Sequence, residues 1–273
     1  MKAERYCVFG NPVGHSKSPE IHAAFARQTG QVIDYRRTLA ALDGFADAVH
    51  RFAAEGGRGA NVTVPFKLEA CALASRLTPR ARAAGAVNTL SFAGADILGD
   101  NTDGAGLVAD IVRNAGVAIE GKRVLLLGAG GAARGALLPL LEQRPLQLCI
   151  ANRTRATAEA LMAQFSPAHP GRLQACDFGE PDAPFDMIIN ATSASLNGDL
   201  PPLSPCAFDA RTLALDMMYG AQATVFMQFA AAHGAQVRDG LGMLVEQAAE
   251  AFLVWRGVRP ETGTVLAQLR ASL

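Results

Sequence analysis

The first third of the chain alternates short apolar runs with segments of helical periodicity. The apolar runs lie at residues 6–10, 32–37 and 59–64, and a helical segment follows each of them. This rhythm is typical of βαβ units, which build a parallel sheet. Residues 88–101 contain two further runs around a turn, which predicts a hairpin-like pair of strands before a helix that begins near Asp103.

Beyond Lys122 the chain carries four more apolar runs, separated by helical or loop segments. They lie at residues 123–128, 147–152, 185–192 and 213–219. Nearly continuous apolar runs of this length indicate strands that are buried on both faces, as in a doubly wound parallel sheet.

The last predicted helix begins near Leu241. Apolar residues recur along it at helical spacing, at Leu244, Ala248, Phe252 and Trp255. An apolar stripe must be covered, so we expect this helix to return to the first domain. The predicted fold class is α/β with two domains. Residues 1–103 and 241–273 form an N-terminal α/β domain with a mostly parallel sheet, and residues 104–240 form a Rossmann-type domain.

The charge balance favours a small molecule as the partner. Among 273 residues, Lys plus Arg and Asp plus Glu number 25 each, so the formal net charge is zero. The absence of a basic excess argues against nucleic acid or an anionic membrane as the main partner. No apolar run approaches membrane-spanning length, and the N-terminus lacks the apolar core of a signal peptide.

The cysteines predict a reducing compartment. They are odd in number, form no C-x-x-C pair and stand in mostly apolar surroundings, at Cys7, Cys71, Cys149, Cys176 and Cys206. This usage indicates buried thiols rather than disulfides or metal ligands. We therefore predict a cytoplasmic protein without a metal site.

A glycine-rich turn follows the first strand of the second domain. Gly128, Gly130 and Ala133 stand in the G-x-G-x-x-A pattern between a strand and a helix. In a dinucleotide site the first glycine turns the chain, the second admits a pyrophosphate, and the small third residue allows close packing. A tight turn without a ligand is the alternative.

The end of the next strand favours NADP(H) over NAD(H). An NAD site usually presents an acidic residue to the ribose there, whereas this chain has Asn152, Arg153, Thr154 and Arg155. A planar guanidinium suits a 2′-phosphate. The competing interpretation is a pair of solvated arginines at a strand end.

Two segments of the first domain supply candidate acid–base chemistry. Lys67 stands in the first turn of a helix predicted to begin at Pro65, after the polar strand residues Asn61 and Thr63. Helix N-termini disfavour cations, which sets this lysine apart from a decorative one, although a surface lysine remains the alternative.

The second segment, Asn101 to Asp103, follows a strand, and Asn88 precedes the hairpin. Asp103 could serve as a helix N-cap. A lysine and a carboxylate that meet beside a nicotinamide would instead form a proton relay for interconverting an alcohol and a ketone.

The segment "GHSKSP" places two hydroxyls, Ser16 and Ser18, one residue apart. Ser18 followed by Pro19 predicts an N-cap with proline at the first helical position, and the helix is expected to end at Gly30. Ser16 has two interpretations, a hydroxyl that bonds its own loop or half of a pair that binds a ligand anion.

Eight segments occur in one order along the chain: "VFGNPVGHSKSPEIH", "NVTVPFK", "AVNTL", "DNTDG", "LGAGGAARG", "NRT", "INATS" and "DGLGMLVEQAAEAF". With them the chain resembles the shikimate dehydrogenase family nearly from end to end. These enzymes use NADP(H) to reduce 3-dehydroshikimate to shikimate in aromatic amino-acid biosynthesis. The resemblance implies a substrate domain, an NADP-binding Rossmann domain, and Lys67 and Asp103 as the catalytic pair.

The resemblance also implies the binding residues. The substrate carboxylate is held by Ser16, Ser18 and Tyr219. The ring hydroxyls are held by Asn61, Thr63, Asn88, Thr102 and Gln247. The cofactor is held by Gly128, Ala129, Gly130, Gly131, Ala132, Asn152, Arg153, Thr154, Thr192, Ser193, Met217, Gly240 and Met243. His15, although inside the first motif, is expected to be structural.

One position departs from the family pattern. Many members carry a second basic residue three positions after the threonine of "NRT", whereas this chain has Thr157 there and Arg155 earlier. The clamp on the 2′-phosphate is therefore expected to depend mainly on Arg153, with a weaker preference for NADP than is usual.

Two other functions stay open at the level of sequence. One is a quinate/shikimate dehydrogenase with a broader substrate range or NAD use. The other is a nonenzymatic ligand-sensing module, against which the presence of both Lys67 and Asp103 argues. Homodimer and monomer are both compatible with the sequence.

Overall fold

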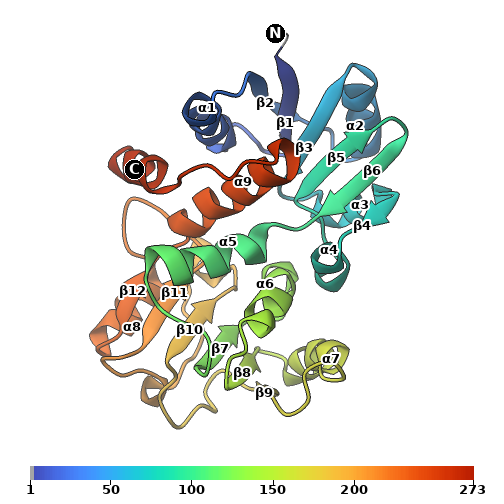
Figure 1. Cartoon of the computed structure of the whole chain (residues 1–273). Coiled ribbons are helices and arrows are strands. Elements are labelled where there is room, and N and C mark those ends of the chain that lie inside the picture. The colour runs from blue at the N-terminus through green and yellow to red at the C-terminus, as the bar shows by residue number, and fades with distance from the viewer. Residues whose placement is uncertain (1–2) are drawn as a thin grey trace. The chain divides into compact units, whose positions relative to one another are not determined.

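The computed structural model describes residues 3–273, which form two α/β units (Figure 1). The first unit comprises the described residues up to Gly106 and a second segment, Leu244–Ala271. The second unit is Leu107–Met243 with Ser272 and Leu273. None of the helices in the described part of the chain combines the length and apolar composition that a bilayer crossing needs.

A six-stranded sheet in the order β2-β1-β3-β5-β6-β4 forms the centre of the first unit. Its strands are β1 (Glu4–Gly10), β2 (Ile33–Leu39), β3 (Gly57–Val62), β4 (Arg76–Leu77), β5 (Thr89–Ala93) and β6 (Asp96–Asp100). The first three strands pair in parallel, and β5 runs antiparallel to both β3 and β6, which confirms the predicted hairpin. Its core centres on Phe9, Phe45, Phe66 and Leu90.

The helices of the first unit are α1 (Ser18–Thr29), α2 (Phe45–Ala54), α3 (Lys67–Leu73), α4 (Pro79–Ala84), the start of α5 (Asp103–Ala109), most of α9 (Leu241–Arg256) and α10 (Gly263–Ala271). In α9, Ala248 and Phe252 are fully buried, and the Trp255 Nε1 donates to the Leu90 carbonyl at 3.0 Å. A side chain at Gly59 would collide with the Trp255 indole, so glycine at this position of β3 admits the helix. The predicted return of this helix to the first domain is therefore confirmed.

The start of α1 differs in one detail from the prediction. The helix begins at Ser18, its N-cap is Lys17, and no side chain caps it, so the prediction of Ser18 as the N-cap is wrong. The Ser18 hydroxyl instead accepts a hydrogen bond from the Ser16 hydroxyl at 3.2 Å. The C-terminal end agrees with the sequence, because Gly30 adopts the left-handed conformation with φ of 66°.

The second unit is built on a sheet whose six strands are all parallel, in the order β12-β11-β10-β7-β8-β9. Its strands are β7 (Arg123–Leu127), β8 (Gln147–Ala151), β9 (Leu173–Cys176), β10 (Met187–Asn190), β11 (Leu213–Asp216) and β12 (Gln236–Arg238). Its helices are a single π-helical turn (Asp110–Asn114) that continues α5, α6 (Gly131–Glu142), α7 (Arg155–Phe165), two 3₁₀ turns (Ala194–Asn197 and Pro205–Ala207) and α8 (Val225–Ala232).

This strand order places a switch point between β7 and β10, from which the chain winds outward in both directions. Dinucleotides bind in open parallel sheets just beyond the carboxyl ends of the strands at such a switch point. In this chain those ends are followed by Gly128 and by Ala191, which begin two of the segments that are expected to bind the cofactor.

Candidate functional site

Lys67 and Asp103 meet across the first unit. The Lys67 Nζ lies 2.6 Å from the Asp103 Oδ2, although 36 residues separate them in the sequence. Each is the first residue of a short helix: α3, which follows β3, and α5, which follows β6. The backbone of both is therefore fixed beyond the carboxyl ends of these strands. Their side chains are 34% and 18% exposed, which leaves both within reach of a ligand.

Asn88 organises the polar groups around this pair. Its Nδ2 lies 2.8 Å from the Asp103 Oδ1, 3.0 Å from the Thr102 Oγ1 and 3.3 Å from the Gln247 Oε1. Its Oδ1 accepts from the Thr102 backbone N–H at 2.8 Å. A buried amide with both ends satisfied holds one orientation, so Asn88 fixes the carboxylate that bonds Lys67.

Gln247 reaches this network from α9 because α5 and α9 approach closely. A side chain at Gly106 would overlap the backbone and Cβ of Gln247. Glycine at this position of the first unit therefore lets α9 place the Gln247 amide beside Thr102, at 3.4 Å between Oε1 and Oγ1.

Asn61 belongs to the same cluster through its Nδ2, and a further partner of its side chain, Tyr35, stands in none of the sequence motifs. The Tyr35 hydroxyl donates to the Asn61 Oδ1 at 2.6 Å, and the Asn61 Nδ2 donates to the Thr89 Oγ1 at 3.2 Å. Tyr35 lies on the edge strand β2, and no motif marks it. Only the strand order, which places β2 two strands from β3, could have suggested that contact.

The two serines of the first motif lie together. Ser16 bonds both the Ser18 hydroxyl and the Ser18 backbone N–H, and Arg37 donates to the Ser16 carbonyl at 2.8 Å. Ser16 therefore bonds its own loop, as the first interpretation predicts, and it also stands next to a second hydroxyl; that the two hydroxyls bind a ligand anion stays a prediction. His15 is exposed.

Three further candidate residues have different surroundings. Thr63 is half-buried beside Gly10, where an added side chain would press on the Thr63 methyl group. Asn101 lies between the hairpin and α5, and its Oδ1 accepts from the Asp103 backbone N–H at 3.1 Å. Tyr219 belongs to the second unit, where 37% of its surface is exposed.

The glycine-rich turn of the second unit has the shape that its pattern predicts. Gly128 has a φ of 99°, which other residues rarely adopt, and Ala133 is fully buried against the sheet. Gly130 and Gly131 are exposed, and a Cβ at either would meet open space, so the amides at the start of α6 are accessible. This opening suits a pyrophosphate at the N-terminus of a helix of 12 residues.

The other predicted cofactor residues gather at the ends of neighbouring strands. A Cβ at Gly128 would lie 3.1 Å from the Thr192 methyl group, so the loops after β7 and β10 touch. The Thr192 hydroxyl donates to the Asn190 Oδ1 at 2.7 Å, which fixes the segment that leads to Ser193. A side chain at Gly240 would collide with the Met217 carbonyl, so the loops after β11 and β12 also touch.

Arg153 and Arg155 differ in their surroundings. Arg155 donates to Glu159 at 3.0 Å and to Glu180 at 2.9 Å, and both pairs are exposed. Within residues 3–273 no hydrogen bond or ion pair engages the guanidinium of Arg153, which is exposed just after β8. Arg153 is therefore the arginine of this segment that is available to an anion.

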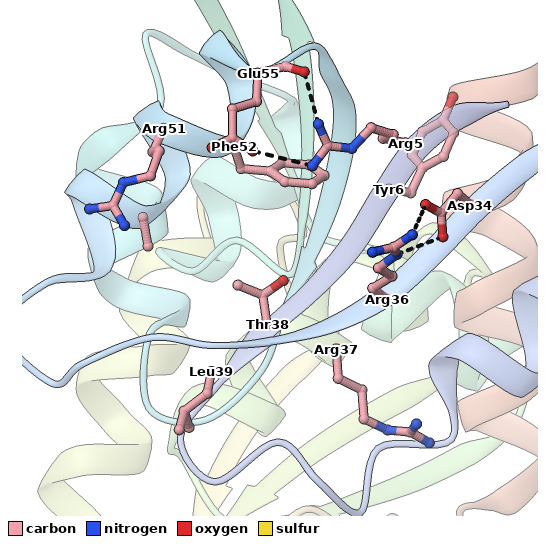
Figure 2. Close-up of a pocket in the computed structure, with 11 residues that line it drawn as sticks. Arg5, Tyr6, Asp34, Arg36, Arg37, Thr38, Leu39, Arg51, Phe52 and Glu55 are labelled. Atoms are coloured by element: carbon pink, nitrogen blue, oxygen red, sulfur yellow. Dashed lines mark hydrogen bonds and ion pairs between the residues drawn. The ribbon is translucent and has the colours of Figure 1, made fainter. Parts of the chain in front are cut away.

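The first unit also has an arginine-rich pocket of about 250 Å³, which is lined by residues of β1, β2 and α2. Figure 2 shows that its cations face acids: Arg5 bonds Glu55, and Arg36 bonds Asp34. Arg37 is committed to Glu20. These ion pairs neutralise most of the positive charge of the pocket, so the pocket is poorly suited to bind an anionic substrate.

The described residues contain no group of three or more His, Cys, Asp or Glu side chains arranged to hold a metal ion. All five cysteines are free thiols.

Three family models match the chain in order. A shikimate dehydrogenase substrate binding domain matches residues 8–90, a shikimate/quinate 5-dehydrogenase model matches 110–197, and a shikimate 5′-dehydrogenase C-terminal domain matches 240–270.

Relatives resemble the chain over its whole length. The shikimate dehydrogenase (NADP(+)) of Herminiimonas arsenicoxydans is 65% identical over 270 residues, which cover 99% of this chain and 98% of the relative.

Two solved structures add the fold. Shikimate 5-dehydrogenase from Thermus thermophilus, in complex with NADP(H) and shikimate, has a TM-score of 0.87 at 31% identity and covers 99% of this chain and 100% of its own. Ligand-free 5-ketofructose reductase of a Gluconobacter species has a TM-score of 0.88 at 29% identity, and the match covers 100% of this chain and 99% of that chain.

Proposed function

Since the chain belongs to the shikimate dehydrogenase family, we propose that Lys67 and Asp103 are the pair that moves the proton in its reaction. The chain is an NADP-dependent oxidoreductase acting on a CH–OH group, which interconverts 3-dehydroshikimate and shikimate in aromatic amino-acid biosynthesis. The observation that carries the assignment of roles is the 2.6 Å contact between the Lys67 Nζ and the Asp103 Oδ2.

The geometry around Lys67 suits a proton donor to a ketone oxygen. An ammonium has three N–H donors, and only one of them is directed at Asp103. The remaining donors of the partly exposed Lys67 can reach the oxygen that becomes an alkoxide, stabilise its charge and deliver the proton. Asp103, fixed by Asn88, keeps the ammonium in place.

The surrounding polar side chains suit a ring that carries several hydroxyls. Amides and hydroxyls both donate and accept, so a cluster of them recognises alcohol groups in one orientation. We assign the ring hydroxyls to Asn61, Thr63, Asn88, Thr102 and Gln247. We assign the carboxylate to Ser16 and Ser18, with Tyr219 assisting.

NADPH, when bound, supplies the hydride for the reduction. The open turn at Gly130 and the unengaged Arg153 fit this cofactor, with the amides of residues 128–132 at the pyrophosphate and Arg153 at the 2′-phosphate. Asn152, Thr154, Thr192, Ser193, Met217, Gly240 and Met243 complete the proposed contacts. We place the reaction in the cytoplasm, in keeping with five free thiols.

The first test measures nicotinamide absorbance in the oxidising direction, with shikimate or quinate and with NADP⁺ or NAD⁺ in all four combinations. We expect fast reduction only with shikimate and NADP⁺, because Arg153 offers a partner to the 2′-phosphate that NAD⁺ lacks. Comparable rates with quinate or NAD⁺ would establish the broader quinate/shikimate dehydrogenase instead. No turnover in any combination would favour the ligand-sensing module.

Replacing Arg153 by alanine should raise the KM for NADP⁺ by about tenfold, the scale of a lost hydrogen bond to a charged group, and leave the KM for NAD⁺ nearly unchanged. Arg155→Ala is the matched control, since Glu159 and Glu180 already engage that guanidinium. Initial rates at saturating shikimate measure both constants. An equal loss with both cofactors would refute the 2′-phosphate assignment.

A further inference from the structure

Two cysteines of the second unit stand sulfur to sulfur. The Sγ atoms of Cys149 and Cys176 lie 2.9 Å apart, on the neighbouring parallel strands β8 and β9. Both are free thiols, and their residues are only 4% and 9% exposed. The other three cysteines lie in different elements, with Cys7 in β1, Cys71 in α3 and Cys206 in a 3₁₀ turn.

The pair lies on a face of the sheet that a small molecule can reach. The crossover from β9 to β10, residues 177–186, contains no helix, whereas α6 and α7 fill the two preceding crossovers. A cavity of about 480 Å³ lies there, lined by both cysteines and by Arg155, Met162, Glu180 and Phe185 among others.

The two thiols are chemically unequal. The hydrogen bond between them lowers the pKa of the Cys176 thiol, against the raising effects of burial and of Glu180, and Arg155 adds to the lowering. The same hydrogen bond raises the pKa of Cys149 together with burial. Cys176 is therefore the sulfur that ionises first, and the thiolate is the form that attacks an oxidant. Cys149 stands beside it in the position of a resolving thiol.

A backbone hydrogen bond connects Cys176 to the segment that is proposed to bind the 2′-phosphate. The Cys176 carbonyl accepts from the Asn152 backbone N–H at 3.3 Å, so β9 helps to place the residue before Arg153. The next residue, Asp177, donates its N–H to Glu180, which also binds Arg155. These contacts connect β9 and the residue that follows it to residues 152–155.

We propose that Cys149 and Cys176 form a modification site that a peroxide converts into a disulfide, and that this bridge weakens binding of NADP(H). The effect on NADP(H) binding rests on the proposed function, whereas the formation of the disulfide does not. The Cys176 thiolate attacks one peroxide oxygen, breaks the O–O bond and becomes a sulfenic acid as hydroxide leaves. The Cys149 sulfur then displaces the sulfenic oxygen, which leaves with the protons as water. Two thiols are oxidised by two electrons, and one peroxide is reduced to two waters.

The test treats the purified full-length protein with hydrogen peroxide and counts free thiols in denaturant with a maleimide mass tag. We expect the number of thiols to fall from five to three, with recovery after a dithiol reductant. Peptide mapping should join residues 147–151 to residues 173–176. After peroxide treatment, the Cys149→Ala and Cys176→Ala proteins should not lose two free thiols. The Cys206→Ala protein, which keeps both Cys149 and Cys176, should lose two of its four free thiols.

NADP⁺ binding to the same samples is measured by titration calorimetry, independently of turnover. We expect the Kd for NADP⁺ to rise by about fivefold in the bridged protein and to return after reduction, the scale of a modest coupling between sites. The peroxide-treated Cys176→Ala protein should keep its affinity.

Each contrary outcome has a separate meaning. Loss of no thiol pair, or a bridge that maps to other cysteines, overturns the site. A mapped Cys149–Cys176 bridge with unchanged NADP⁺ affinity overturns its effect on the cofactor. If the reduced protein binds NADP⁺ but does not oxidise shikimate, the proposed function fails while the thiol count still decides the modification.

Discussion

Replacement of Lys67 by alanine is expected to lower kcat for shikimate oxidation by roughly two orders of magnitude or more, the scale of a lost acid–base group, with a smaller change in KM. The ammonium is the only charged donor that Asp103 binds in the cluster, and alanine leaves water to move the proton. Initial rates across shikimate concentrations separate the two constants.

Lys122→Ala is a suitable control, because this lysine also pairs with an aspartate, Asp186, at 3.2 Å and is similarly exposed. It lies in the second unit, outside the proposed cluster, and should keep normal turnover. Asp103→Asn should also lower kcat, since the amide keeps the shape of the side chain but loses the charge that holds the ammonium. Near-normal turnover of Lys67→Ala would exclude the proton-transfer role.

Arg80→Ala is expected to reduce the free energy of unfolding of the first unit by about 3 kcal/mol, the cost of leaving a buried charge without its partner. Arg80 donates to both Asp100 oxygens, at 2.7 and 2.6 Å, and to Glu250 at 2.8 Å. Asp100 is only 3% exposed, and removal of the guanidinium leaves it with Thr78 and one backbone amide.

Urea unfolding followed by tryptophan fluorescence measures this loss, because the single tryptophan, Trp255, lies in the first unit. Arg82→Ala is the matched control on the same helix, since Arg82 is exposed, and its effect should stay within about 0.5 kcal/mol. An Arg80→Ala protein as stable as this control would show that the ion pair contributes little.

The loss of stability in Arg80→Ala is expected to depend on pH. Burial alone raises the pKa of Asp100, but the hydrogen bonds from Arg80 and Thr78 lower the pKa overall. A lowered folded pKa means that the stabilisation is complete above the unfolded pKa of about 3.9 and is lost as pH falls through the folded value. The stability gap between wild type and Arg80→Ala should therefore narrow below about pH 4, and a gap that stays constant into acid would contradict this origin.

The strongly apolar strands and the glycine-rich turn could be predicted from sequence for physical reasons. The strands β7, β8, β10 and β11 each contain four consecutive buried residues, and Gly128 needs its positive φ, so both leave a local pattern. The strands β9 and β12 and the helices α4 and α10 were missed, because elements of three to nine residues with mixed polarity show no clear period.

Contacts between distant segments left no such pattern. Tyr35 reaches Asn61 across 26 residues, and Arg80 reaches Glu250 across 170. The pairing of Cys149 with Cys176 depends on the register of β8 against β9, which the spacing of the cysteines does not encode. Ser18 is not the N-cap because the helix already begins at this residue, and its hydroxyl accepts a local hydrogen bond from Ser16.

The division of the chain also bears on its synthesis. The second unit is one continuous stretch, apart from its last two residues, whereas the first unit is interrupted and needs Leu244–Ala271 to finish. On the ribosome, the strands of the first sheet are synthesised early. Trp255, whose indole bonds the Leu90 carbonyl and packs on Gly59, is synthesised after the second unit. The whole continuous part of the second unit is synthesised before Leu244–Ala271, so we expect its parallel sheet to be able to form before the first unit has all of its residues.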